Sequence, residues 1–373
     1  MIVEDKLGFS TEVMVHTDCR HFLGDRPCKP HKSKGVHCEG CEEYDPISKR
    51  ILIIKLGAVG DVIRTTPLLH VLKKPGVHIT WLTETPEVIP QRQVDRIFKL
   101  DASSLAYLQA TSFDVLYNLD KDSQAIALCK LVKAKEKFGF TMKDGVCEPI
   151  DDQAHAKWLT GLFDDLNQKN RLSYLDETFA MCGLQFKGER YIIELDGTSP
   201  FDIDLPRPLI GLNTGCGARW PSRLWAFENW AALIRKLQEA DLGVLLLGGP
   251  DEDEKNKKLA ETTGAAYAGY FPLQQFFHLV NEVDVLVTGV TMALHIGIGL
   301  DKRIVLFNNI FNRNEFELYD LGQIIEPDVD CLGCFKPVCE DDCMNLLKPD
   351  QVFEVVSLEA VKVGAGGRAA VKP

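Results

Sequence analysis

The chain has 373 residues, of which 45% are hydrophobic and 26% are charged, and this is the composition of a globular protein long enough for two domains. The formal net charge of −12 argues against a nucleic-acid partner. The first twenty residues lack the apolar core of a signal peptide, and no apolar run is long enough to span a bilayer, so we expect a cytoplasmic protein.

Residues 1–48 are rich in cysteine and have little apolar periodicity. The candidate metal ligands in this segment are Cys19, Cys28, His31, Cys38 and Cys41. Two pairs among them, Cys28 with His31 and Cys38 with Cys41, have the spacing of tetrahedral zinc sites. Because disulfides are rare in a reducing compartment, we predict a metal-binding knuckle, with five candidates for four places. The alternative is an unstructured leader with incidental thiols.

Residues 49–200 are predicted to form a first α/β domain. The apolar run 51–54 predicts a strand buried on both faces, followed by a glycine loop with Gly57 and Gly60 and a helix from Asp61 into the seventies. Backbone N–H groups at such a loop favour an anionic ligand. Asp61 is either a helix cap or a group directed at substrate, and its position fits both interpretations.

Further strands, at 77–83, around 96–100 and at 113–119, indicate a doubly wound parallel sheet. Ligands bind such sheets at the carboxyl ends of the strands, where Glu84, Asp120 and Lys121 follow. We expect these three to be ordinary loop charges. A helical region at 150–186 carries an apolar stripe that we expect in the core or between domains: Trp158, Leu159, Leu162, Phe163 and Leu166.

A stretch rich in breakers, 196–208, is the predicted domain boundary, and the α/β pattern then repeats over 207–345. The predicted elements are a strand at 208–213 with a glycine loop after it, a helix at 226–238, a strand at 242–247 that ends in Gly248 and Gly249, and segments at 272–281, 283–287, 291–299 and 303–307. Two similar halves predict a cleft between two Rossmann-like domains, where two substrates can meet away from water.

The last segment, 346–373, is predicted to contain a helix at 350–361 that docks on the first domain and a disordered tail at 364–373. The first glycine loop only partly matches a dinucleotide fingerprint. Lys55 stands where its first glycine should be, although Glu84 lies at a suitable distance for a ribose-binding residue. An NAD-type oxidoreductase is therefore the weaker alternative.

Four motifs in order, K-L-G-A-V-G-D-V-x-x-T-x-P, a glycine loop with R-L-W, L-L-L-G-G-P and T-x-x-x-H, resemble the bacterial heptosyltransferases, glycosyltransferase family 9, over residues 50–345. The resemblance implies the GT-B architecture and the inverting transfer of heptose from ADP-heptose without a catalytic metal. The acceptor hydroxyl could belong to a saccharide, a lipid-linked saccharide or a protein. The sequence does not fix the oligomeric state, and a homo-oligomer is compatible with it.

By this resemblance Asp61 is the base that deprotonates the acceptor, and Arg223 holds the donor diphosphate. The expected nucleotide-sugar site also includes Gly57, Gly60, Thr214, Gly215, Gly217, Gly248, Gly249, Thr291 and His295. The family's Asp-Thr-Gly is replaced by Val290-Thr291-Met292, which leaves the identity of the donor open. The same replacement supports a second alternative, a metal-containing scaffold that binds a sugar nucleotide without turnover.

A second likeness concerns the segment 308–319 and the C-x2-C-x4-C-x3-C motif formed by Cys331, Cys334, Cys339 and Cys343. Both resemble the autotransporter heptosyltransferase branch, which carries a cysteine-bound iron near its C-terminus and modifies protein hydroxyls. Four thiolates accept zinc or iron, so the ligands do not choose between them. We expect a structural metal, because a closed four-thiolate site leaves no open position. By analogy, residues 315–317 help to position the donor ribose.

Overall fold

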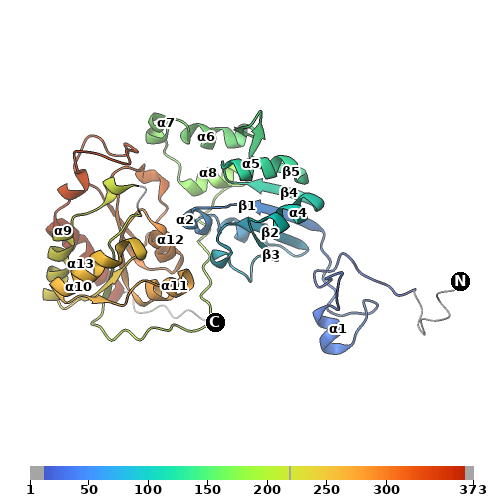
Figure 1. Ribbon diagram of the computed structural model, residues 1–373, viewed down its shortest axis with the longest axis horizontal. Helices are drawn as coiled ribbons and strands as arrows, with labels where there is room; N and C mark the ends of the chain where they lie inside the picture. The colour runs from blue at the N-terminus through green and yellow to red at the C-terminus, as the bar shows by residue number, and fades with distance from the viewer. Residues whose placement is uncertain (1–11, 218–219, 366–373) are drawn as a thin grey trace.

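The computed structural model describes residues 12–217 and 220–365, so most of the predicted tail at 364–373 lies outside the described residues. The chain forms two lobes side by side, each built on a six-stranded sheet, and a small N-terminal segment with helix α1 (Lys29–Lys34) projects from the first lobe (Figure 1). None of the described helices is both long and apolar enough to cross a membrane.

The first sheet has the strand order β3-β2-β1-β4-β5-β6. Strands β1 to β5 pair in parallel and β6 is antiparallel to β5. The strands are β1 (Lys49–Ile54), β2 (Val77–Thr83), β3 (Arg96–Lys99), β4 (Ser112–Asn118), β5 (Lys133–Lys143) and β6 (Val146–Pro149). The helices of this lobe are α2 (Val59–Ile63), α3 (Leu68–Leu72), α4 (Ala102–Ala110), α5 (Ser123–Leu131), α6 (Asp152–Thr160), α7 (Asp164–Lys169) and α8 (Tyr174–Met181).

The second sheet is entirely parallel, with the order β12-β11-β10-β7-β8-β9. Its strands are β7 (Leu209–Asn213), β8 (Gly243–Leu247), β9 (Ala266–Tyr267), β10 (Val285–Gly289), β11 (Arg303–Phe307) and β12 (Gly322–Ile325). The helices are α9 (Phe227–Glu239), α10 (Asp253–Thr263), α11 (Leu273–Glu282), α12 (Met292–Gly299) and α13 (Pro349–Ala365). Numbered within its own lobe, each sheet has the Rossmann order 3-2-1-4-5-6, which confirms the predicted doubly wound architecture.

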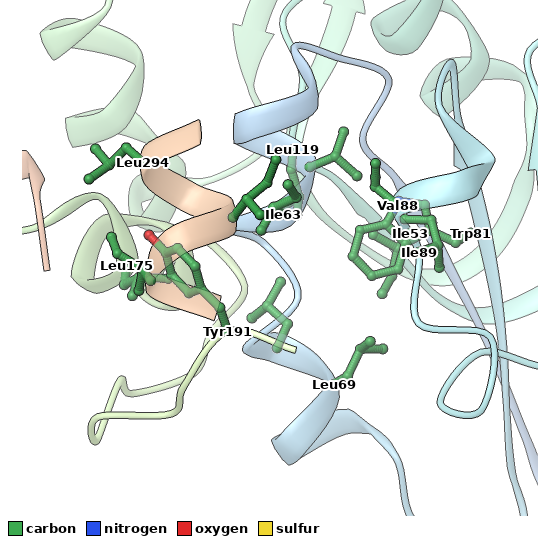
Figure 2. Close-up of a cluster of buried hydrophobic side chains, with 14 of the residues drawn as sticks. Ile53, Ile63, Leu69, Trp81, Val88, Ile89, Leu119, Leu175, Tyr191 and Leu294 are labelled. Carbon is green, nitrogen blue, oxygen red and sulfur yellow. The ribbon is translucent and has the colours of Figure 1, made fainter. Parts of the chain in front are cut away.

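The two lobes share one continuous hydrophobic core where α12 packs against α2. Figure 2 shows Leu294 of α12, Tyr191 and Leu175 on one side of this contact and Ile63 of α2 on the other. The approach is close because residue 60 is glycine: a Cβ atom there would lie 2.6 Å from Cδ2 of His295. Apolar burial of this extent holds the lobes face to face.

Three sequence predictions about elements are wrong. The helix expected from Asp61 into the seventies is two short helices, α2 and α3, because Pro67 cannot continue the first and the hydroxyls of Thr65 and Thr66 bond back to the carbonyls of Asp61 and Ile63.

The apolar stripe at 158–166 is only partly covered. Helix α6 ends at Thr160, so the helical period is broken, and Leu162, Phe163 and Leu166 are exposed. The terminal helix α13 docks on the second lobe and not on the first. Its buried residues Val352, Val356 and Ala360 join the core formed by β7, β10, β11 and α9, and α13 lies beside α9 in Figure 1.

Candidate active site

The first lobe has a cavity of about 670 Å³ at the carboxyl ends of β1 and β4, where the strand order reverses. Asp61 lies after β1 and Asp120 after β4, and both line this cavity. Glu84, Lys121 and Gly57 line it as well. The switch point of the first sheet therefore brings together the polar residues that follow its strands.

Asp61 is not a helix cap. The N-cap of α2 is Ala58, and Asp61 lies in the first turn with its carboxylate Oδ1 2.8 Å from the Arg64 guanidinium. Its side chain is enclosed by protein yet keeps 35% of its surface exposed to the cavity. Burial alone would raise the pKa of Asp61. The charges of Arg64 and Lys55 together outweigh burial and lower the pKa to about 2. The carboxylate is therefore ionised at neutral pH.

Arg64 is a functional candidate that the sequence interpretation missed. Its guanidinium carbon lies 3.4 Å from the ring centroid of Tyr174, and its side chain is 13% exposed. Among the described residues, its Nε atom has no hydrogen-bond partner. The available signal was its spacing, since residues three apart on a helix lie on the same face.

A buried ion pair lines the first cavity. Lys55 and Asp120 form a buried ion pair, and Asp120 also accepts a hydrogen bond from the backbone N–H of Leu56. Asp120 is therefore not the ordinary loop charge that we expected. Lys55 is also buried, at 3% exposure. Next to this pair, burial and the charge of Lys157 lower the pKa of Lys121 to about 8.

A second cavity, of about 620 Å³, lies between the lobes. It is lined from the first lobe by α2 and the residues before it, and from the second lobe by the loops after β7 and β10. The predicted site residues that line it are Gly60, Asp61, Gly215, Gly217, Arg223, Gly249, Thr291 and His295. Asn213 ties the two loops together, because its Nδ2 donates to Thr288 Oγ1 at 3.0 Å and to Thr291 Oγ1 at 3.2 Å.

Arg223 is held at this cavity by backbone carbonyls. It donates to the carbonyl of Cys216 at 2.6 Å and to that of Val290, and its guanidinium carbon lies 5.3 Å from the ring centroid of Phe311. Among the described residues it has no carboxylate partner, and its Nε lacks a hydrogen bond. Burial lowers the pKa of Arg223. A half-buried cation without an anionic partner is suited to bind an anionic ligand.

His295 reaches the cavity from α12, at the contact with the first lobe. Burial and the nearby charge of Arg64 lower the pKa of His295 to about 3, so its imidazole is neutral. Its Nδ1 lies 3.5 Å from the hydroxyl of Tyr191, and its ring contacts Gly60. His295 therefore packs as a buried, neutral side chain at the contact between the two lobes.

Three of the predicted nucleotide-sugar residues lie elsewhere. Gly57 lines the first-lobe cavity, whereas Thr214 and Gly248 line neither cavity. Thr214 is buried, and its hydroxyl donates to Asn256 Oδ1 at 2.6 Å. Of the predicted ribose segment 315–317, Glu315 lines the interlobe cavity.

Glu252 was missed by the sequence interpretation. Its carboxylate accepts a hydrogen bond of 2.9 Å from the backbone N–H of Gly249, and its side chain lies against Gly215. It therefore joins the two glycine loops at the edge of the interlobe cavity. The signal for it was the acid-rich helix start directly after the glycine turn.

The predicted metal ligands are not arranged around a common point. Among residues 12–217 and 220–365, no three His, Cys, Asp or Glu side chains converge closely enough to hold a metal ion. In the C-terminal loop Cys343 is buried, and its sulfur lies 3.3 Å from Nδ2 of Asn309, whereas Cys331 is exposed. The metal sites therefore stay predictions.

Similar solved structures have the same fold. ADP-heptose LPS heptosyltransferase II from Escherichia coli superposes with a TM-score of 0.64 at 15% identity, over 84% of this chain and 99% of that one. Heptosyltransferase WaaC from E. coli, with ADP-2-deoxy-2-fluoro heptose, gives 0.59 at 17% identity, over 83% and 100%. The iron-containing dodecameric glycosyltransferase TibC from E. coli gives 0.53 at 13% identity, over 85% and 77%.

These neighbours confirm the GT-B arrangement of two facing α/β lobes. No curated protein sequence matches the chain. The family model of glycosyltransferase family 9 (heptosyltransferase) matches residues 102–313, more than half of the chain. The chain therefore belongs to glycosyltransferase family 9, the heptosyltransferase family, and is a glycosyltransferase.

Proposed function

We propose that this glycosyltransferase inverts configuration, and that it moves a heptose from ADP-heptose to an acceptor hydroxyl with Asp61 as the general base. The observation that carries the proposal is the position of Asp61, which borders both the first-lobe cavity and the interlobe cavity. An ionised carboxylate between two cavities can take a proton from a hydroxyl in one as that hydroxyl attacks a sugar in the other.

Each lobe has one task in this scheme. Residues 49–200 bind the acceptor in the first-lobe cavity, and residues 207–345 bind the donor through Arg223 and the glycine loops after β7 and β8. The exposed third of the Asp61 side chain provides the surface that the acceptor hydroxyl approaches. The acceptor is a saccharide, a lipid-linked saccharide or a protein hydroxyl.

In the transfer step, the acceptor oxygen forms a bond to the anomeric carbon while the bond from that carbon to the diphosphate oxygen breaks. Attack from the side opposite the diphosphate inverts the carbon. Asp61 accepts the hydroxyl proton, and Arg223 stabilises the negative charge that develops on the leaving ADP. The low pKa of Asp61 keeps the carboxylate ionised at neutral pH, so its oxygens are free to take this proton as the hydroxyl attacks.

ADP-heptose is the proposed donor because the structural neighbours act on or bind it. Heptosyltransferase II is named for this donor, and WaaC holds a fluorinated analogue of it. The replacement of the family's aspartate by Val290 leaves the sugar open to test. A thermal-shift screen against ADP-, GDP- and UDP-sugars identifies the donor, since a ligand of the native state raises its apparent stability.

The C-terminal thiols Cys331, Cys334, Cys339 and Cys343 are proposed to hold a structural zinc or iron ion. The donor set suits a tetrahedral thiolate site. The contact from Asn309 to the Cys343 sulfur is of the kind that orients metal-bound thiolates. TibC, which has the same fold, is iron-containing. An ion bound by these thiols would fix the loop that carries them. The transfer step itself uses Asp61 and Arg223.

Substitution of the base tests the proposal. We expect Asp61→Asn to lower the transfer rate at least about 100-fold, because a neutral amide cannot accept the proton. Donor affinity, measured by calorimetry, should change little. Glu87→Gln is the matched control, since Glu87 is an exposed carboxylate of the same lobe outside both cavities. An Asp61→Asn enzyme as active as this control would contradict the assignment of the base.

A further inference from the structure

The N-terminal module, residues 12–48, is a small folded unit without a hydrophobic core. Figure 1 shows it projecting from the first lobe, away from the second. Pro30 is the only buried residue among residues 12–48, and the larger apolar side chains of the module are exposed. The exposed ones are Val13, Met14, Val15, Phe22 and Leu23. A unit of this length needs a metal or disulfides to hold one conformation.

The module encloses a cavity of about 260 Å³ in the place of a core. All five candidate ligands line this cavity, and every cysteine among them is a free thiol. The surface of the module is held by polar contacts: Lys34 pairs with Glu43, and the Tyr44 hydroxyl donates to Asp18 at 2.6 Å. Surface pairs of this kind contribute little stability.

Four of the five candidates come from two local structures that present paired ligands. Cys28 is the N-cap residue of α1 and His31 lies in the first turn of that helix. Cys38 and Cys41 are joined by a tight turn, in which the Cys41 N–H donates to the Cys38 carbonyl at 3.3 Å and Gly40 has φ of 70°. A C-x2-C turn beside a helix start is a common source of zinc ligands.

The ring of His31 is oriented for ligation. Its Nδ1 lies 2.9 Å from the carbonyl oxygen of Val36, so we assign the proton to Nδ1. Nε2 then carries the free lone pair. Metal-bound histidines usually donate their second ring N–H to a carbonyl in this way. His31 can therefore act as a neutral nitrogen ligand without a change of backbone.

We propose that Cys28, His31, Cys38 and Cys41 bind one zinc ion, which replaces the missing core of the N-terminal module. Three cysteines with one histidine form a known class of tetrahedral structural site. These four side chains do not converge on one point in this structure, so zinc binding requires the thiols to turn about χ1 between staggered positions, and each then loses its proton to become a thiolate. Cys19 lines the same cavity, and its backbone pairs with Pro46 inside the module; because it belongs to neither of the two local ligand pairs, we leave it out of the proposed set.

Zinc content of the full-length protein, purified without chelator, tests the site. Because the C-terminal thiols can hold a second ion, the readout is a difference between variants. We expect Cys38→Ser and Cys41→Ser to contain one zinc per chain less than the wild type, and Cys19→Ser to contain as much as the wild type. Unchanged zinc in Cys38→Ser, or an equal loss in Cys19→Ser, would overturn the proposed ligand set.

His31 provides a sharper test. As a ligand it should be replaceable by another ligand, so His31→Cys should keep the zinc that His31→Ala loses. An equal loss in both would mean that His31 only holds the Val36 carbonyl, which overturns its assignment.

Limited proteolysis provides a readout that does not depend on activity. Removal of zinc should open the module to trypsin after Lys32 and Lys34 while the two lobes stay intact, and Cys38→Ser should be cleaved there without chelator. A module that resists trypsin after zinc removal would contradict a metal-held fold.

Discussion

At the scale of single residues, the surroundings of Asp61 decide what it can do. Its place after a buried strand was visible in the sequence, and the structure resolves the choice between a helix cap and a cavity residue. Arg64 could not be identified in the same way, because a single helix arginine is most often a surface charge. Only the fold places Tyr174 of α8 over its guanidinium.

The pairing with Arg64 predicts a change in pH dependence. In the wild type the pKa of Asp61 is about 2, so the base stays ionised over the usual assay range. In Arg64→Gln, burial is no longer offset by that charge, and the pKa of Asp61 rises. Because activity needs the carboxylate, it should be lost as pH falls through the raised pKa. The acid limb of the kcat/KM profile therefore moves to higher pH.

The matched control is Arg64→Lys, which keeps the positive charge. It should retain the wild-type acid limb even if its rate is reduced. Identical acid limbs in Arg64→Gln and the wild type would show that Arg64 does not control the ionisation of Asp61.

At the scale of elements, strands such as β1, β7 and β8 followed from the sequence because each is a buried apolar run next to turn residues. Strands β5, β6, β9 and β12 were not predicted, because β5 is rich in charged residues and the other three are only two to four residues long. The exposed α6–α7 stripe and the docking of α13 could not be derived in this way. An amphipathic pattern predicts that one face of a helix is covered, but it does not show which lobe covers it.

The cysteine loop, residues 331–343, makes a further contact that no motif predicts. Its backbone supports the short helix η3 (Pro221–Arg223): the Ser222 N–H donates to the Pro337 carbonyl at 3.2 Å and its hydroxyl to that of Lys336 at 2.8 Å.

Asn309 links Cys343 at the end of the cysteine loop to the short helix η3, which carries Arg223. Its Nδ2 donates to the Ser222 carbonyl at 2.8 Å and lies 3.3 Å from the Cys343 sulfur. We expect Asn309→Ala to loosen the Arg223 loop and to weaken donor binding about tenfold, which corresponds to roughly 1.4 kcal/mol. Calorimetric titration with the donor measures this. Asn229→Ala is the control, because Asn229 bonds to Asn345 and none of the described hydrogen bonds joins it to Ser222 or Cys343; equal donor affinities in the two variants would contradict the link.

At the scale of the whole molecule, function depends on how the lobes face each other. Besides the α2–α12 contact, side-chain amides connect them: Asn312 Nδ2 donates to the carbonyls of Asn167 at 2.6 Å and Asn170 at 2.8 Å, and Gln168 donates to the carbonyl of Gly333 at 2.9 Å. The repeated α/β pattern predicted two lobes. It could not predict these contacts, because they join residues far apart in sequence through irregular loops.

Gly60 tests the packing between lobes. We expect Gly60→Ala to destabilise the protein by about 1–3 kcal/mol, because the added methyl group would overlap His295. Denaturant unfolding measures the change. Gly57→Ala is the control from the same loop, since a Cβ at Gly57 meets no atom within 4 Å. Equal stability of the two variants would mean that the lobes do not need this close approach.

The central claim is that an ionised carboxylate of the first lobe meets a sugar whose diphosphate is held by the second. A crystal structure with ADP-2-deoxy-2-fluoro heptose, the ligand present in the WaaC structure, tests it most directly. We predict that the diphosphate lies within hydrogen-bond distance of Arg223 and that the anomeric carbon faces the cavity bordered by Asp61. A diphosphate bound away from Arg223, or an anomeric carbon turned away from Asp61, would contradict the account.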